Sequence, residues 1–492
     1  MILPRQFKLP LFVGLQLALV ALFGLAPAHA SEADNETAIQ NEVAIEFEAQ
    51  SGEIVEAFQG QFEVPSNWHD LNGDILTLSY VRFPSTGVNA GSPIVYLAGG
   101  PGGSGSATAR GRRFPLFMAM REFGDVVAFD QRGTGNSSRP PGCTSGQTID
   151  DGTRYSDKEF VGAYRAAADE CLAQWTDQGI RPQDWTTLQS VGDLDALRRH
   201  LRADKINLWG ISYGSHLALA ALKEMDNRIE RVILASVEGL DQTVKRPSET
   251  DAYFNRLQDA INTRPKLREQ FPDIVGLIQR VHEMLDAEPV MVQVIPGDGE
   301  AYDYLLETRD MRFVSSMMIA DPGFALRLLD LYRALDAGSS EPPGRLLADF
   351  HTQNQPFNFA VMPLFMDLAS GIDADALRQF EEESQTALLG TILNFPMPHL
   401  HDVVPGLDLG ATFRQPPESE VPTLVLTGTL DGRTYPDSQL AAVSGLANAE
   451  IVMIENAGHN LFMTNPAVTE RIQAFMRGAT GTSKIHVESW AR

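Results

Sequence analysis

The chain has 492 residues, of which 43% are hydrophobic and 21% are charged, a composition that is typical of a globular protein and excludes a wholly disordered one. Its length exceeds the size at which a single hydrophobic core stops growing, so we expect two domains or one domain with a large insertion. The formal net charge of −25 argues against nucleic acid and anionic membranes as partners, because both are themselves negatively charged. A solubilising surface accounts for most of this charge, and a modest part would favour cationic substrates such as free amino termini.

The first 30 residues have the pattern of a secretory signal peptide. Two basic residues precede an apolar run over residues 11–25, and residues 28–30 read Ala-His-Ala, a small-residue cleavage site. The alternative is an uncleaved membrane anchor, but this apolar run is short for a spanning helix. We therefore expect cleavage before Ser31 and export to the periplasm or beyond the cell.

Cys143 and Cys171 are the two cysteines of the chain. In an exported protein, such a pair favours one disulfide, whereas the alternative is two buried free thiols. A bridge would close a loop of about 28 residues and stabilise the fold by roughly 3 kcal/mol. No histidine or cysteine cluster accompanies the pair, so we expect no metal site.

The first half of the chain alternates between strand and helix patterns. Residues 44–48, 60–64 and 74–83 alternate apolar and polar side chains, which predicts antiparallel strands at a sheet edge. Short continuous apolar runs then predict buried parallel strands at residues 93–98, 125–130, 205–209 and 231–235. Helical patterns separate them at residues 114–123, 158–175 and 190–203. This alternation predicts an α/β fold with a doubly wound, mostly parallel sheet, whose functional groups lie at the carboxyl ends of the strands.

Residues 241–417, here called the insertion, lack this alternation. Helical patterns dominate them, among them one over residues 302–318, and Pro and Gly separate the helices. The strand pattern returns at residues 422–428 and 449–454, followed by a helix over 466–476. We therefore predict a signal peptide (1–30), a core in two parts (31–240 and 418–492) and a helical cap between them (241–417).

Residues 210–214 read Gly-Ile-Ser-Tyr-Gly between a predicted strand and a predicted helix. In such a turn, the hydroxyl of Ser212 projects outward, and the glycines at 210 and 214 allow the neighbouring backbone to approach. A serine nucleophile needs a histidine to take its proton and a carboxylate to orient that histidine. Asp431 and His459 follow the two later strands in the order that α/β-hydrolases require, which makes Ser212, Asp431 and His459 the candidate catalytic triad.

A glycine-rich loop at residues 99–105 follows the first buried strand. We expect it to supply one oxyanion-hole N–H, from Gly100 or less clearly from Gly99, and Tyr213 to supply the other. The alternative, a phosphate-binding loop, lacks the Lys-Ser/Thr ending and the dinucleotide spacing. The proposed chemistry needs no cofactor.

Together these segments resemble the prolyl aminopeptidase family and its exported tripeptidyl-aminopeptidase branch. The resemblance rests on residues 99–105 (Gly-Gly-Pro-Gly-Gly-Ser-Gly), 130–137 (Asp-Gln-Arg-Gly-Thr-Gly-Asn-Ser), 210–215 and 426–434. It implies the α/β-hydrolase fold and hydrolysis of peptides from a free amino terminus through an acyl-enzyme. In that family, cap carboxylates bind the substrate amine, and Glu238, Asp241, Glu249, Glu382 and Glu383 are possible counterparts, although a solvated surface explains each of them as well.

The chain also departs from the family pattern. Ala98 stands where a histidine usually opens the glycine loop, and the cysteines of the family's cap have no counterpart here. We expect Arg132 to pair with Asp130 or another loop carboxylate and to brace the glycine loop. An esterase or lipase with the same triad, and a non-catalytic binding protein on this fold, are the alternatives.

Overall fold

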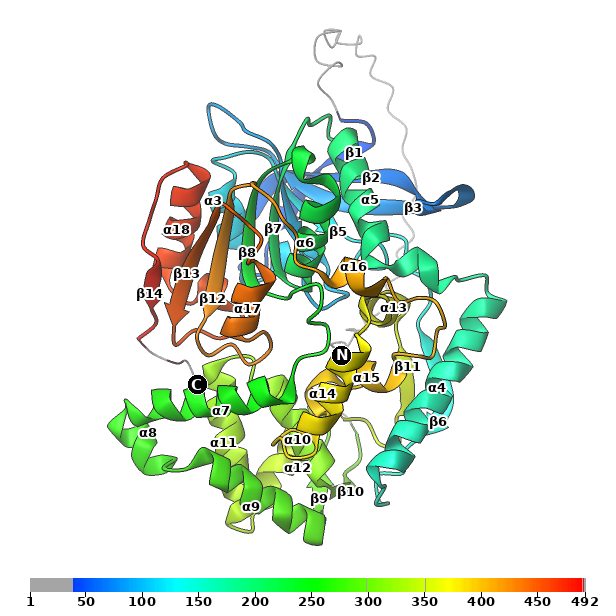
Figure 1. Ribbon diagram of the computed structural model, residues 1–492, viewed down its shortest axis with the longest axis vertical. Coiled ribbons are helices and arrows are strands. Elements are labelled where there is room, and N and C mark those ends of the chain that lie inside the picture. Colours follow the sequence, from blue (N-terminus) through cyan, green and yellow to red (C-terminus); the bar gives the residue numbers. More distant parts are fainter. Residues whose placement is uncertain (1–38, 298, 350, 489, 491–492) are drawn as a thin grey trace, which may run out of the picture.

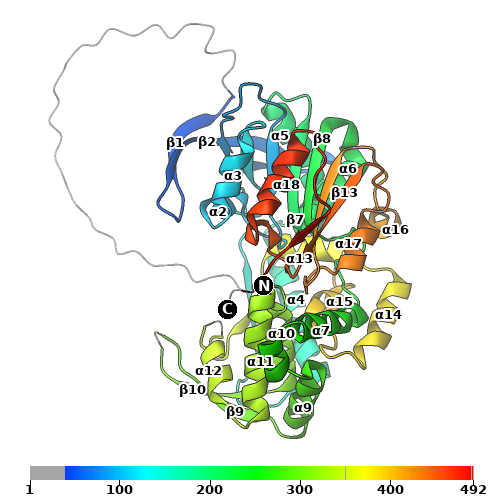
Figure 2. The same cartoon turned by 90° about the vertical axis from the view of Figure 1, so that its left-hand side faces the viewer.

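The computed structural model describes residues 39–297, 299–349, 351–488 and 490, so the predicted signal peptide lies outside the described residues. A large sheet with its covering helices forms one half of the molecule, and the helix-rich insertion forms the other (Figures 1 and 2). Among the described residues, no helix has both the length and the apolar character needed to span a membrane.

The sheet has ten strands in the order β1-β2-β3-β5-β4-β7-β8-β12-β13-β14. Strands β1 to β3 pair antiparallel at one edge, β3 pairs antiparallel with β5, and the strands from β5 to β14 are parallel. The predicted α/β fold and its antiparallel edge are therefore confirmed. The strands are β1 (Glu42–Glu48), β2 (Ile54–Asn67), β3 (Asp70–Phe83), β4 (Ile94–Leu97), β5 (Val126–Asp130), β7 (Ile206–Ser212), β8 (Ile229–Val237), β12 (Thr423–Gly428), β13 (Ala449–Glu455) and β14 (Lys484–His486).

Helices cover both faces of this sheet. On one face, α3 (Phe114–Met120) and α18 (Pro466–Met476) pack on side chains such as Tyr96, and on the other α5 (Thr187–His200) and α6 (Tyr213–Met225) pack on Val95 and Leu97. Successive side chains of a strand point to opposite faces, so a central strand must be apolar at every position. This explains why the apolar runs are continuous.

The insertion has its own hydrophobic core, built mainly from α7, α9, α10 and α11. Its helices are α7 (Pro247–Asn262), α8 (Pro265–Gln270), α9 (Ile274–Ala287), α10 (Thr308–Met318), α11 (Pro322–Asp336), α12 (Glu341–Leu347), α13 (Val361–Ser370), α14 (Ala374–Ser384), α15 (Met397–Leu400) and α16 (Gly410–Arg414). The helix expected over residues 302–318 begins only at Thr308. Residues Tyr302–Leu306 instead form β10, because they pair antiparallel with β9 (Val290–Val294).

Residues 143–177 leave the sheet and lie beside the insertion. Strand β6 (Cys143–Thr148) pairs with β11 (Pro356–Phe359) of the insertion, and α4 (Asp157–Asp177) runs alongside α15 and β11 (Figure 1). A disulfide joins Cys143 to Cys171 with their Cα atoms 5.6 Å apart, which confirms the predicted bridge. It fixes the start of β6 to α4.

Candidate active site

Ser212 lies at the junction of β7 and α6, in a backbone conformation that few residues adopt. Its φ of 55° and ψ of −130° turn the chain sharply between strand and helix. A positive φ strains the backbone of any residue other than glycine. The flanking glycines are sterically required, as predicted. A Cβ at Gly214 would lie 2.0 Å from the Leu97 carbonyl oxygen, and one at Gly210 would lie 2.4 Å from the carbonyl oxygen of Gly214.

Asp431 and His459 come together in the loops that follow β12 and β13. His459 Nδ1 lies 3.1 Å from Oδ1 and 3.0 Å from Oδ2 of Asp431, whose side chain is completely buried. The backbone N–H groups of Arg433 and Thr434 donate to Oδ1 at 2.8 and 2.9 Å, and the Thr434 hydroxyl donates to Oδ2 at 2.9 Å. The carboxylate therefore has several donors that favour its charged form.

These contacts favour the ionised form of Asp431. Burial alone would raise the pKa of Asp431, but the adjacent His459 and the hydrogen bonds from Thr434 and Arg433 outweigh it, and the pKa is lowered. An ionised carboxylate only accepts hydrogen bonds, so Nδ1 of His459 carries the proton it donates. In the neutral imidazole, Nε2 is then free to accept a proton.

A pocket of about 300 Å³ joins these groups. Ser212 and His459 both line it, together with Gly99 and Gly100 from the glycine loop. Asp431 is not part of the lining and lies behind His459. The structure thus brings the predicted nucleophile, the predicted base and the predicted oxyanion loop to one cavity at the carboxyl ends of β4, β7 and β13.

The glycine loop passes directly over the serine. A Cβ at Gly99 would lie 2.9 Å from Cβ of Ser212, and Gly100 has a φ of 132°, which favours glycine. Tyr213 is the first residue of α6, where backbone N–H groups have no partner within the helix. Both expected donors therefore belong to segments that border Ser212.

Asp130 ties the two glycine-rich signatures together. Its carboxylate accepts hydrogen bonds from the Ser104 hydroxyl at 2.7 Å, from the N–H and hydroxyl of Ser106 at 3.0 and 2.7 Å, and from the Asn136 N–H at 3.0 Å. Oδ1 accepts from Ser104 and Ser106, and Oδ2 accepts from Ser106 and Asn136. Asp130 therefore braces the loop over Ser212.

Arg132 pairs neither with Asp130 nor with another loop carboxylate, so this expectation is wrong. Its guanidinium forms a fully buried, two-pronged pair with Asp193 of α5 at 2.7 and 2.6 Å, and it also donates to the carbonyl oxygens of Ser66 and Asp184. Both oxygens of Asp130 already accept two hydrogen bonds each, and the guanidinium of Arg132 donates to Asp193 of α5 instead. It joins β2, η1 (Pro182–Trp185) and α5 rather than the glycine loop.

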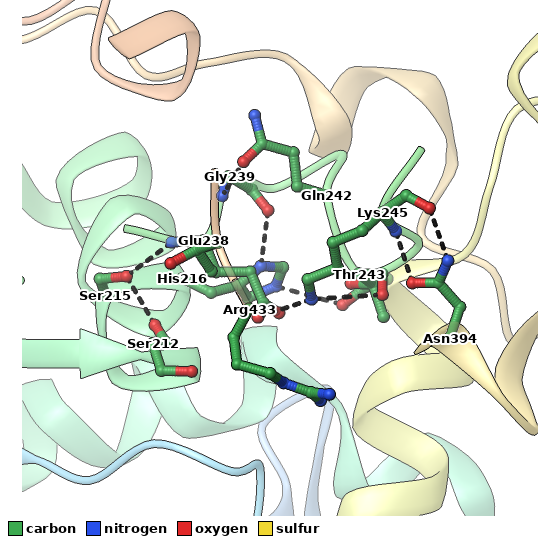
Figure 3. A network of polar contacts seen from close by, with 12 residues as sticks. Ser212, Ser215, His216, Glu238, Gly239, Gln242, Thr243, Lys245, Asn394 and Arg433 are labelled. Carbon is green, nitrogen blue, oxygen red and sulfur yellow. Dashed lines mark hydrogen bonds and ion pairs between the residues drawn. The ribbon is translucent and has the colours of Figure 1, made fainter. Parts of the chain in front are cut away.

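A polar network leads from the elbow to the insertion (Figure 3). The Ser215 hydroxyl donates to the Ser212 carbonyl oxygen at 2.5 Å and accepts from the Glu238 N–H at 2.9 Å. The carboxylate of Glu238 pairs with the Lys245 ammonium at 2.9 Å. Lys245 exchanges two backbone hydrogen bonds with the side chain of Asn394, so the network ends in the insertion.

Glu238 is the only one of the five candidate amine-binding carboxylates that lines the pocket. Three cations of the pocket, Arg113, Lys245 and Arg433, are not predicted from the sequence. Arg433 follows Asp431 by two residues, and this proximity is a signal in the sequence that it lies near the site. Arg113 and Lys245 are far along the chain from the triad, and only the folded structure brings them to the pocket. In the described part of the chain, no group of three or more His, Cys, Asp or Glu side chains is placed to hold a metal ion.

Comparison with known proteins agrees with this architecture. Residues 92–466 match the family model described as "alpha/beta hydrolase fold". The chain is 31% identical over 184 residues to "Serine protease Hip1" of Mycobacterium tuberculosis, which covers 36% of this chain and 35% of that protein. It is 26% identical over 227 residues to "Proline iminopeptidase" of Arabidopsis thaliana, with 45% of each chain covered.

A third relative is "Tripeptidyl aminopeptidase" of Streptomyces coelicolor, 26% identical over 193 residues, covering 36% of this chain and 34% of that protein. The alignments span less than half of each of these three relatives.

Proposed function

Because the chain belongs to the family with the alpha/beta hydrolase fold, we propose that it is a serine hydrolase with Ser212, His459 and Asp431 as its catalytic triad. One observation carries this proposal. The buried Asp431 holds His459 by Nδ1, and His459 and Ser212 line the same pocket. Nothing in a purely structural role requires a serine on a strained elbow to share a cavity with an oriented histidine.

In the proposed mechanism, Ser212 Oγ attacks the substrate carbonyl carbon while His459 Nε2 takes the hydroxyl proton. The N–H groups of Tyr213 and Gly100 stabilise the oxyanion of the tetrahedral intermediate. His459 returns the proton to the leaving group, and an ester between Ser212 and the acyl group remains. Water, activated by the same imidazole, then releases the acid and restores the serine. Asp431 keeps its charge throughout and stabilises the imidazolium.

We propose peptides with free amino termini as substrates. The named activities of the proline iminopeptidase and tripeptidyl aminopeptidase relatives support this choice. One observation favours the esterase alternative instead, because the carboxylate of Glu238 is already paired with Lys245 and is not free to bind an amine. We also propose that the protein is exported from the cytoplasm, and the disulfide supports this, since such bonds persist in oxidising compartments.

A fluorophosphonate probe tests the nucleophile. It should label the wild-type protein at Ser212 and leave Ser212→Ala unlabelled, and this variant should lose hydrolysis by at least about 10³-fold. Ser444→Ala, a change at a serine of the loop after α17 (Pro436–Ala442), is the matched control and should label normally. A folded wild-type protein that does not react would refute the hydrolase proposal.

A substrate panel separates the two activities. Peptide anilides with free and with blocked amino termini are compared with p-nitrophenyl esters. An aminopeptidase should cleave the free peptides at least about 10-fold faster than the blocked ones, since the lost amine contact is a charged hydrogen bond. Equal cleavage of the free and the blocked peptides would favour an endopeptidase, and cleavage of esters alone would favour the esterase.

A further inference from the structure

The candidate pocket is positively charged although the chain as a whole is strongly negative. Arg113, Lys245 and Arg433 line it, and Glu238 is the single carboxylate of the lining. The formal net charge of the chain is −25. The composition of such an acidic chain would favour a negatively charged pocket, so the positive charge comes from the placement of these particular residues.

Glu238 and Lys245 neutralise one another. Their charged atoms lie 2.9 Å apart, both side chains are largely buried, and burial, which would raise the pKa of Glu238, is outweighed by Lys245, so that this pKa is lowered. The pair therefore brings no net charge to a ligand. Two guanidinium groups remain.

Neither guanidinium has a carboxylate partner within 4.0 Å among the described residues. Arg433 donates from Nη1 to the Ser316 carbonyl oxygen at 2.8 Å, a neutral partner. Figure 3 draws no contact from its guanidinium to the other labelled residues. Its charge is therefore available to the pocket.

Arg113 is held in place by neutral groups as well. It donates to the Tyr96 hydroxyl and, at 3.2 Å, to Oδ1 of Asn460, and it stacks over the Phe462 ring at 5.3 Å. Asp321 accepts hydrogen bonds from Asn460 but does not line the pocket. Arg113 is thus positioned without being neutralised.

We propose that the pocket selects substrates that carry a carboxylate next to the scissile carbonyl, and that Arg433, together with Arg113, binds this carboxylate. A half-buried guanidinium fits a planar carboxylate with two parallel hydrogen bonds, and it loses less hydration on binding than an ammonium does. The proposal rests on the proposed function, because it assumes that the reacting bond lies between Ser212 and these cations. In a peptide, the carboxylate is either an acidic side chain or the C-terminal carboxylate.

Matched ligand pairs that differ only in charge test the proposal. Glutamic acid α-p-nitroanilide is compared with the glutamine anilide for a side-chain carboxylate, and trialanine with its C-terminal amide for the terminal one. The p-nitrophenyl monoesters of glutaric acid and of its monoamide extend the comparison to esters. In at least one pair, kcat/KM should be at least 10-fold higher for the charged member, and this ratio should shrink as salt is raised. A ratio near one in all three pairs would overturn the proposal.

A binding measurement keeps the test independent of turnover. The anilide and trialanine pairs are titrated calorimetrically onto the Ser212→Ala protein. Tighter binding of a charged member by at least 10-fold supports the carboxylate site even if the wild-type protein hydrolyses nothing, in which case the proposed function fails alone. Equal affinities within each pair refute the carboxylate site even if hydrolysis is fast.

Variants assign the preference to a residue. Arg433→Gln should lower the charged-to-neutral ratio several-fold towards one, because Arg113 alone remains to bind the carboxylate. Arg433→Lys, which keeps the charge but not the two parallel hydrogen bonds, should retain only part of the ratio, and Arg433→Glu should lower it further than Arg433→Gln does. Arg345→Gln on α12, which removes a charge paired with Glu341 outside the pocket, is the matched control and should leave the ratio unchanged. An unaltered ratio in Arg433→Gln would remove this residue from the proposal.

Discussion

At the junction of β7 and α6, Gly214 lies where no side chain fits. A Cβ there would be 2.0 Å from the carbonyl oxygen of Leu97 on β4, and backbone atoms cannot rotate away as a side chain can. The strained Ser212 depends on this close approach, because α6 must begin directly against the sheet. The glycine is thus part of what holds the serine at the pocket.

Gly214→Ala should destabilise the protein by about 3 kcal/mol, since β4 and α6 must separate to admit the methyl group. Urea unfolding measures this loss. Gly162→Ala on α4 is the matched control, because a Cβ at Gly162 meets nothing within 4 Å. This control should gain up to about 1 kcal/mol from helix propensity. Equal stability of Gly214→Ala and the wild type would contradict the steric account of the elbow.

Between the helices of the insertion, a buried histidine makes stability depend on pH. His282 of α9 lies 2.8 Å from the hydroxyl of Tyr332 on α11, and its side chain is almost completely buried. Burial, reinforced by the charge of Arg312 and opposed by Asp286, lowers the pKa of His282 to about 4. In the unfolded chain, a histidine has a pKa of about 6.5.

The sign of the effect follows from these two values. Between pH 6.5 and 4, the unfolded state binds the proton and the folded state does not, so the stabilising contribution is complete above pH 6.5 and is lost as the pH falls towards 4. The loss amounts to roughly 3 kcal/mol. His282→Gln, which keeps a hydrogen-bonding group for Tyr332, should therefore lose less stability than the wild type between pH 7.5 and 4.5.

Denaturant unfolding at these two pH values measures the difference. His69→Gln, a change at an exposed histidine in the turn between β2 and β3, is the control and should follow the wild type. A variant at position 282 with the wild-type pH dependence would show that His282 does not carry the effect.

Over the whole molecule, the sequence predicts those features of the fold and of the site that follow from local patterns of side chains and from the order of the strands. Continuous apolar runs predict buried strands because each strand is covered on both faces, and the chain order of Ser212, Asp431 and His459 predicts their meeting because parallel strands end at one edge. The sequence does not predict the pairing of β9 with β10. Residues 302–306 have a helical pattern of their own, and they form a strand only because β9 pairs with them.

The pocket cations show the limit of such reasoning. Arg113 precedes α3, Lys245 precedes α7, and Arg433 follows β12, so no spacing along the chain relates them. The pairing of Glu238 with Lys245, which leaves the two arginines uncompensated, depends on side-chain geometry. The sequence therefore predicts the chemistry of the site, whereas the net charge of the pocket can be derived only from the structure.

The disulfide acts at the scale of the whole molecule, because it braces residues 143–177, which leave the sheet and pair with the insertion. Cys143 begins β6, which pairs with β11 of the insertion, and Cys171 lies on α4. The bridge spans 28 positions, and the chain-entropy model gives a loop of this size a stabilisation of roughly 3 kcal/mol. A Cys143→Ser, Cys171→Ser double variant should therefore lose about that free energy of unfolding.

This prediction separates the bridge from the rest of the fold. Reductant should lower the unfolding midpoint of the wild type in urea and should not change that of the double variant, which has no bridge to lose. Neither cysteine lines the pocket, so the folded variant should retain its hydrolytic rate. If the reduced and the oxidised wild type unfold at the same urea concentration, the disulfide does not contribute to stability. Residues 143–177 are then held against the insertion by the pairing of β6 with β11 and by the packing of α4 alone.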